Sequence, residues 1–211
     1  MPNLKTTAAI LVALTAWSML GLQLALTLNN MAAEGLVAGL WRYLGFFTIL
    51  TNLGVAVVAS AMVVKPSLAG PRVRLATAAS ILFVAVVYSL ALRNVWHPTG
   101  WQAVADHGLH DATPLLFLVA WLLADHGALK WRDALWAMAP PLAYCLYAFA
   151  RGAADGWYAY WFLDPHALSP LKLAGCIAVL SAAVLIIAFA LTAVDRRLGR
   201  RGLGELRDLS L

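Results

Sequence analysis

Charged residues are scarce in this sequence. Of its 211 residues only 12% are Asp, Glu, Lys or Arg, whereas 63% are hydrophobic, and the mean hydropathy is +0.79. Soluble domains are about 45–50% apolar and about 25% charged, and a soluble fold of this length cannot bury the excess apolar surface. The scarcity of charge therefore excludes a soluble globular protein and predicts a chain whose solvent is lipid.

The sequence also has little cysteine and no recognisable linker. Cys145 and Cys176 each lie alone inside an apolar run, so we expect small buried side chains rather than a disulfide framework. No Gly/Ser-rich stretch, low-complexity tract or fixed-period repeat divides the chain. We therefore predict one domain over residues 1–211.

Six apolar segments each approach the roughly 20 residues that a helix needs to cross a bilayer. The predicted fold is all-α, a bundle of six transmembrane helices. The first segment is longer than the ~7–15-residue apolar core of a signal peptide, which favours a retained helix. The six segments are Thr6–Leu28, Leu44–Val63, Leu75–Leu92, His107–Leu123, Ala134–Ala150 and Leu171–Val194.

Most of the 15 Lys and Arg residues fall on one side of this predicted topology. Cytoplasmic loops of membrane proteins are enriched in Lys and Arg, so we expect both termini in the cytoplasm, as in a bacterial inner-membrane protein. The basic segment 195–211 is predicted to be a cytoplasmic tail that favours anionic lipid headgroups. The positive charge forms no continuous face, so no nucleic-acid partner is expected. The cations of the opposite side are Arg42, Arg93, Arg151 and Lys172.

Two of the expected outer loops, "NVWHPTGWQAVAD" and "AADGWYAYWFLDPHALSP", are rich in Trp, Tyr, Pro and Gly. Such aromatics form interfacial belts in many membrane proteins, and they also suit a lid over a cavity. Both interpretations remain open, and Trp157 and Tyr160 are candidates for substrate binding.

Titratable groups cluster in "DHGLHDATPLL", where the fourth span is expected to begin. Asp106, His107, His110 and Pro114 are spaced to share one helical face, and Asp106 lies four residues before His110, where it can orient the imidazole. Pro114 lacks the N–H that would bond the carbonyl of His110, which predicts a local distortion. Polar groups within a membrane are costly, so they mark a functional site, although Asp106 and His107 also suit a capped helix end at the interface.

The second span carries a polar stripe in "WRYLGFFTILTNLG". Thr48 and Asn52 recur at helical spacing with Gly45, and Thr51 lies a turn beyond Thr48. Helix–helix packing is one interpretation of this stripe. Because both segments enter from the same side, Thr48 and His110 are also expected at one depth in the outer leaflet.

A hydroxyl and an imidazole at one depth suit acyl transfer. The imidazole removes the proton as the hydroxyl attacks an ester carbonyl and then returns it to the leaving alcohol. In apolar surroundings a donor aimed at the oxyanion is strengthened, and Asn52 and Tyr88 are candidates for that role.

At these residues the chain resembles the androgen-induced-protein family, especially its bacterial six-helix relatives. Animal members are membrane hydrolases that split fatty acid esters of hydroxy fatty acids with a threonine nucleophile and a histidine. The resemblance rests on "WRYLGFFTILTN", "DHGLHDATPLL" and "GWYAYWFLDP", in family order. It implies that His110, in an H-G-x-H pattern, is the catalytic histidine. Direct alignment places the family's threonine at Gly45; a shift of one helical turn places it at Thr48, with Thr51 in reserve.

The sequence leaves two classes of function open. The first is an intramembrane lipid-ester hydrolase of the threonine type, opening to the outer leaflet, in which Arg42 or Arg93 holds a carboxylate head. The second is a non-catalytic binder of a lipid or quinone, or a small transporter. A haem or zinc protein is a weaker third possibility, because only His107 and His110 lie close together on one helix. No cofactor is expected.

Overall fold

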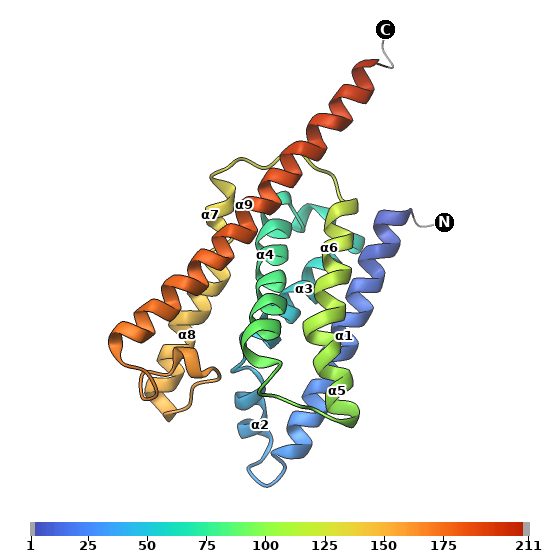
Figure 1. Ribbon diagram of the computed structural model, residues 1–211. Helices are drawn as coiled ribbons and strands as arrows, with labels where there is room; N and C mark the ends of the chain where they lie inside the picture. Colours follow the sequence, from blue (N-terminus) through green and yellow to red (C-terminus); the bar gives the residue numbers. More distant parts are fainter. Residues whose placement is uncertain (1–2, 209–211) are drawn as a thin grey trace.

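Helices follow one another along the whole described chain (Figure 1). The computed structural model describes residues 3–208, with side chains to residue 200, and no strand occurs in that range. The helical elements, in chain order, are α1 (Leu4–Asn30), α2 (Leu36–Tyr43), α3 (Phe47–Val64), η1 (Pro66–Leu68), α4 (Pro71–Val87), η2 (Tyr88–Leu92), α5 (Gly100–His107), η3 (Gly108–Ala112), α6 (Thr113–Leu123), α7 (Asp133–Trp136), α8 (Ala139–Asp155), η4 (Trp161–Leu163) and α9 (Pro170–Asp208).

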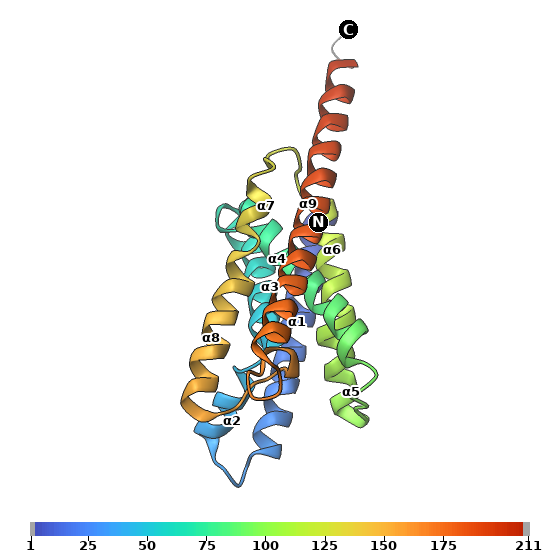
Figure 2. The ribbon, with the colours of Figure 1, turned by 60° about the vertical axis from the view of Figure 1, so that its left-hand side comes forward.

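The long helices run alternately up and down the bundle, and the start of α1 and the last turns of α9 lie towards one end of it (Figures 1 and 2). Polar contacts at this end join segments that are far apart in sequence. Lys5 forms an ion pair with Asp125, and a guanidinium N–H of Arg74 donates to the Asp125 carbonyl at 3.1 Å. Arg72 Nε lies 2.8 Å from the buried carboxylate of Asp133. The Lys- and Arg-rich segments therefore gather at the end that carries the termini.

Four helices are long and apolar enough to cross a membrane by length and composition. Large apolar side chains on their outer faces, such as Val64 and Leu171 at 84% exposure each, have no protein cover. Soluble monomers rarely leave extensive apolar surface open to water, so the molecule has the character of a membrane protein. The four helices are Leu4–Asn30, Phe47–Val64, Pro71–Leu92 and Pro170–Arg200.

The predicted start of the second segment, Leu44, is wrong. Instead of one helix from Leu44, the chain forms α2, breaks at residues 44–46, and begins α3 at Phe47. Of the six predicted spans, the fourth and the fifth are interrupted. The fourth begins earlier, as α5, and passes through the π-turn η3 into α6. The fifth divides into α7 and α8.

Pro140 and Pro141 fall near the middle of the predicted fifth segment, but they do not kink a helix there. They lie in the first turn of α8, where the N–H that proline lacks would have no intrahelical partner. The prolines therefore start a helix rather than bend one.

The basic segment from residue 195 is not a separate tail where the structure describes it. The helix α9 continues through it to Asp208 and projects beyond the bundle (Figure 1). The side chains of Arg201 and Arg207 lie outside the described residues.

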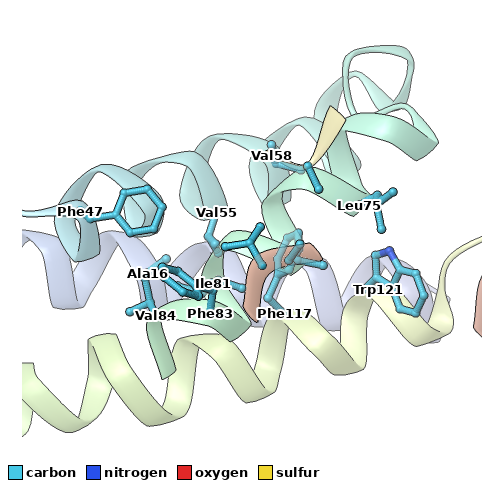
Figure 3. Packing of buried hydrophobic residues seen from close by; sticks show 14 of the residues in the cluster. Ala16, Phe47, Val55, Val58, Leu75, Ile81, Phe83, Val84, Phe117 and Trp121 are labelled. Carbon is cyan, nitrogen blue, oxygen red and sulfur yellow. The ribbon is translucent and has the colours of Figure 1, made fainter. Parts of the chain in front are cut away.

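The core is built where α1, α3, α4 and α6 meet (Figure 3). Val55 of α3, Ile81 of α4 and Phe117 of α6 are fully buried and belong to one cluster. This packing holds α3 and α6 at a fixed distance, and therefore positions the polar residues that α3 and η3 carry.

Candidate active site

Thr48 and His110 meet inside the bundle. Thr48 Oγ1 lies 3.2 Å from His110 Nε2, although the two residues come from separate helical segments. Thr48 is 8% exposed, and the His110 side chain is 12% exposed. The structure therefore brings together the hydroxyl and the imidazole that the sequence predicted at one depth.

The surroundings of His110 select one tautomer. Its Nδ1 lies 3.0 Å from the backbone carbonyl of Asp106, which can only accept a hydrogen bond. Nδ1 of the neutral ring therefore carries the proton, and Nε2 presents a lone pair to Thr48. An oxygen of the Asp106 carboxylate lies 3.4 Å from Nδ1, where it stabilises the ring once Nε2 is protonated. Tyr88 stacks on the imidazole with ring centroids 3.9 Å apart and donates its hydroxyl to Asp106.

The break between α2 and α3 places Thr48 in the first turn of a helix. Backbone N–H groups of a first turn have no intrahelical acceptor and form the positive end of the helix dipole. The carbonyls on the other side of the break accept hydrogen bonds from α8: Tyr147 donates to Leu44 at 3.2 Å, and Tyr144 donates to Gly45 at 3.0 Å. Tyr144 and Tyr147 therefore stabilise the break between α2 and α3. Because of this break, the first backbone N–H groups of α3, near Thr48, have no intrahelical acceptor.

Tyr160 completes the surroundings of Thr48. The backbone N–H of Thr48 donates to the Tyr160 hydroxyl at 3.3 Å, and that hydroxyl lies 3.4 Å from Thr48 Oγ1. Because the Thr48 proton points to His110 and the phenol oxygen accepts from the backbone, the phenol proton of Tyr160 can be donated to Thr48 Oγ1 or to a group bound beside it. The sequence had assigned Tyr160 to substrate binding, and the structure places it directly at the hydroxyl.

Gly45 is closed to any side chain. A Cβ there would lie 2.5 Å from the ring of Trp157 and 2.9 Å from a guanidinium nitrogen of Arg151. A threonine at Gly45, as direct alignment with the family would place it, has no room in this packing. A side chain at Gly45 would therefore have to displace Trp157 and Arg151.

Asn52 links the two halves of the site. The N–H of Thr113 bonds to the carbonyl of Gly108, five residues back, which makes η3 a π-turn. In the same five-residue pattern the next donor would be residue 114 and its acceptor the carbonyl of Leu109. Residue 114 is a proline and has no N–H, so that carbonyl lacks its backbone partner. The Asn52 amide supplies the missing donor at 3.2 Å and also donates to Thr48 O at 2.9 Å. Asn52 and Tyr88, predicted as oxyanion donors, are instead committed to positioning His110 and its neighbours.

Two cavities meet at Thr48. The larger, which we call the chamber, has a volume of about 290 Å³ and reaches from His110 towards Gln23 and Gln102. The smaller, which we call the slot, has about 60 Å³ and lies between α3, α4, α8 and α9 with an apolar lining that includes Phe83 and Val184. Four residues line both cavities and separate them: Thr48, Tyr88, Leu92 and Tyr160.

Two further residues predicted at the site, Thr51 and His107, do not lie at His110 in the structure. The Thr51 hydroxyl has no partner among the described residues and lines a different cavity, with Ser80. His107 is 64% exposed and bonds to Asp111 at 2.7 Å. The sequence placed both histidines on one face, but the π-turn rotates them apart.

Neither arginine proposed to hold a carboxylate lines the chamber or the slot. Arg93 forms an ion pair with Asp111, and Arg42 lies over the ring of Trp157 at 4.1 Å. Trp157, also predicted to contact substrate, covers the helix break instead, where it packs against Phe46 with ring centroids 5.5 Å apart.

Sequence reasoning missed Arg151, which it treated only as an outer-side cation. Arg151 is 4% exposed, lies over Trp41 at 3.9 Å, and donates to the Tyr147 hydroxyl at 3.1 Å. The nearby Asp155 accepts from the Trp41 indole and the Trp157 N–H, and these hydrogen bonds hold the pKa of its carboxyl below the ordinary value. These contacts of Arg151 and Asp155 hold the end of α8 against the break between α2 and α3.

Comparison with known proteins finds no relative of this chain. No protein-family model matches the sequence, no curated protein matches it, and no solved structure matches the fold. The family resemblance therefore stays a prediction. Among residues 3–200, no three His, Cys, Asp or Glu side chains gather as a possible metal site.

Proposed function

We propose that the protein is a membrane hydrolase of fatty acyl esters, with Thr48 as nucleophile and His110 as general base. The observation that carries this proposal is the 3.2 Å approach of Thr48 Oγ1 to Nε2 of His110, at the junction of the chamber, which polar groups of Gln23, Gln102 and Asp106 face, and the apolar slot. A nucleophile held by an oriented base is the recurring arrangement of acyl-transfer enzymes.

In the first half of the proposed reaction, Thr48 Oγ1 attacks the ester carbonyl while its proton passes to His110 Nε2. The negative charge that develops on the carbonyl oxygen is stabilised by the Tyr160 hydroxyl and by the positive end of the α3 helix dipole. The bond between the carbonyl carbon and the alcohol oxygen then breaks, and His110 gives its proton to that oxygen.

In the second half, a water molecule attacks the acyl-threonine ester. His110 accepts a proton from this water and returns it to Thr48 Oγ1 as the ester bond breaks. The products are one fatty acid and one alcohol, and the enzyme regains its starting protonation state.

We further propose six membrane crossings, with both termini in the cytoplasm of a bacterial cell and the chamber open to the outer leaflet. The Lys- and Arg-rich segments at the end with the termini support this orientation. The interrupted segments α5–η3–α6 and α7–α8 are then the fourth and fifth crossings, because irregular backbone is tolerated at membrane depth where protein buries it.

One labelling experiment tests both reaction and orientation. A fluorophosphonate with a permanently charged, membrane-impermeant tail is expected to label right-side-out membrane vesicles on the peptide that contains Thr48, and to leave sealed inside-out vesicles unlabelled. The Thr48→Ala variant should remain unlabelled in both. Labelling only of inside-out vesicles would reverse the proposed orientation, and no labelling even in detergent would contradict a reactive hydroxyl.

The slot is expected to hold the part of the acyl chain nearest the carbonyl, because its walls are apolar and it begins at Thr48, although its volume of about 60 Å³ is too small for a whole C16 chain. Ser181 is a small, partly buried residue of α9 in this wall, so Ser181→Phe should fill the slot. We expect kcat/KM for a 4-nitrophenyl ester of a C16 acid to fall about tenfold or more, while hydrolysis of the acetyl ester changes little. The neighbouring Ala182 is exposed and does not line the slot, so Ala182→Phe is the matched control. Equal effects on the two chain lengths would show that the acyl chain lies elsewhere.

A further inference from the structure

The chamber differs from the slot in the polar groups that face it. Gln102 of α5 donates to the side-chain oxygen of Gln23 of α1 at 2.7 Å, and Gln23 donates to the Thr27 hydroxyl at 3.3 Å. Each primary amide has two N–H donors and one acceptor oxygen. Among the described residues this chain of bonds leaves one donor on each amide and the oxygen of Gln102 for a ligand.

The charge in the chamber is negative. Asp106 is the charged residue among those that line it, and no Lys or Arg of the described chain does so. Arg93 is bound to Asp111 and lies over the Tyr88 ring at 4.9 Å, and Arg42 is stacked on Trp157, so neither guanidinium lines the chamber. A carboxylate in the chamber would meet a fixed carboxylate without a neutralising partner, which is unfavourable in a cavity of low dielectric.

The size of the chamber also limits its occupant. Its volume of about 290 Å³ is near the lower end of the ~300–1,000 Å³ typical of small-molecule sites. A short group with several hydroxyls fits both the volume and the mixture of unused donors and acceptors, because each hydroxyl both donates and accepts.

We infer that the alcohol part of the substrate is a small neutral polyol, so that the preferred esters are monoacylglycerols or chemically similar single-chain polyol esters. This inference rests on the proposed hydrolase function. With the acyl chain in the slot and the carbonyl at Thr48, the polyol oxygen that leaves takes its proton from His110, and the remaining hydroxyls bond to Gln102 and Gln23. The products are one fatty acid and one neutral polyol.

A matched pair of esters tests the inference. The same oleoyl group is esterified to glycerol or to glycerate, which differ by one carboxylate, and the 4-nitrophenyl ester serves as a reference without a polyol. The purified protein in detergent is expected to hydrolyse the glycerol ester at least about tenfold faster, measured as kcat/KM. Gln102→Leu should lower the ratio of glycerol ester to 4-nitrophenyl ester several-fold, because a hydrogen bond to the polyol is lost.

Two further variants sharpen the result. Gln102→Lys adds a cation beside the same position and should shift the preference towards the glycerate ester. Val104→Leu, a half-exposed residue of α5 that does not line the chamber, should leave the ratio unchanged. Hydrolysis of all esters without preference, or an unchanged ratio in both Gln102 variants, would overturn the polyol inference alone. Hydrolysis of none of the three esters would overturn the proposed function, and the inference with it.

Discussion

Replacement of Thr48 by Ala is expected to lower kcat for a chromogenic fatty ester by at least about a thousandfold, because among the described residues no other side-chain hydroxyl is hydrogen-bonded to a ring nitrogen of His110. Replacement of His110 by Gln should lower kcat by roughly 10²–10⁴-fold, the usual contribution of a general base. The double variant should be little worse than Thr48→Ala alone, since the two residues act as one unit.

Thr51→Ala is the matched control for this result. Thr51 lies on the same helix and is similarly buried, at 7% against 8% for Thr48, but its hydroxyl lines a cavity away from His110. Its loss should leave kcat within about twofold. A Thr48→Ala protein that keeps the melting temperature and the full turnover of the parent would remove Thr48 from the reaction, and equal losses in Thr48→Ala and Thr51→Ala would point to packing instead.

The second large effect is expected at Asn52, which is fully buried. Asn52→Leu removes the donor to the Leu109 carbonyl, which Pro114 leaves without a partner. Interhelical hydrogen bonds in membranes contribute on average about 0.6 and at most about 1.7 kcal/mol, whereas an unsatisfied buried carbonyl in a soluble protein costs about 1–3 kcal/mol. We expect a loss near 1–2 kcal/mol of unfolding free energy. We also expect a fall of about 100-fold in kcat, because the turn that carries His110 loses its anchor.

A rescue variant separates this explanation from simple overpacking. Pro114→Ala restores an N–H one turn beyond Leu109, so the double variant Asn52→Leu/Pro114→Ala should recover part of the stability and part of the activity lost in Asn52→Leu. The measurement is a double-mutant cycle on the melting temperature and on kcat. Strictly additive effects would show that Asn52 does not compensate for the proline.

Several features of the fold could be predicted from residue order alone. The apolar runs locate α1, α3, α4 and α9 because the roughly 20-residue length of a membrane helix is imposed by the bilayer and not by other parts of the protein. The alternation of basic and non-basic loops likewise predicted which loops share an end of the bundle. Helical periodicity placed Thr48 on a polar stripe and predicted that Asp106 and His110, four residues apart, share one face.

Other features depended on interactions that residue order does not reveal. The break at Gly45 is stabilised by Tyr144 and Tyr147 of α8, about 100 residues away in sequence, so a periodic apolar pattern predicted an unbroken helix. The π-turn η3 rotates His107 away from His110, and a constant 3.6-residue repeat cannot predict that rotation. Arg151 resembled a helix-end cation because its aromatic neighbours come from two other segments.

The sequence by itself determined the solvent of this protein and the set of groups able to move protons, because both follow from composition and from the cost of placing polar side chains in lipid. Only the tertiary structure decided which of those groups face one another. Tyr160 comes from a distant loop, Asn52 bridges two helices, and the two arginines are held outside the cavities. These outcomes follow from packing between segments far apart in the chain, which sets distances to within an ångström and which no local pattern encodes.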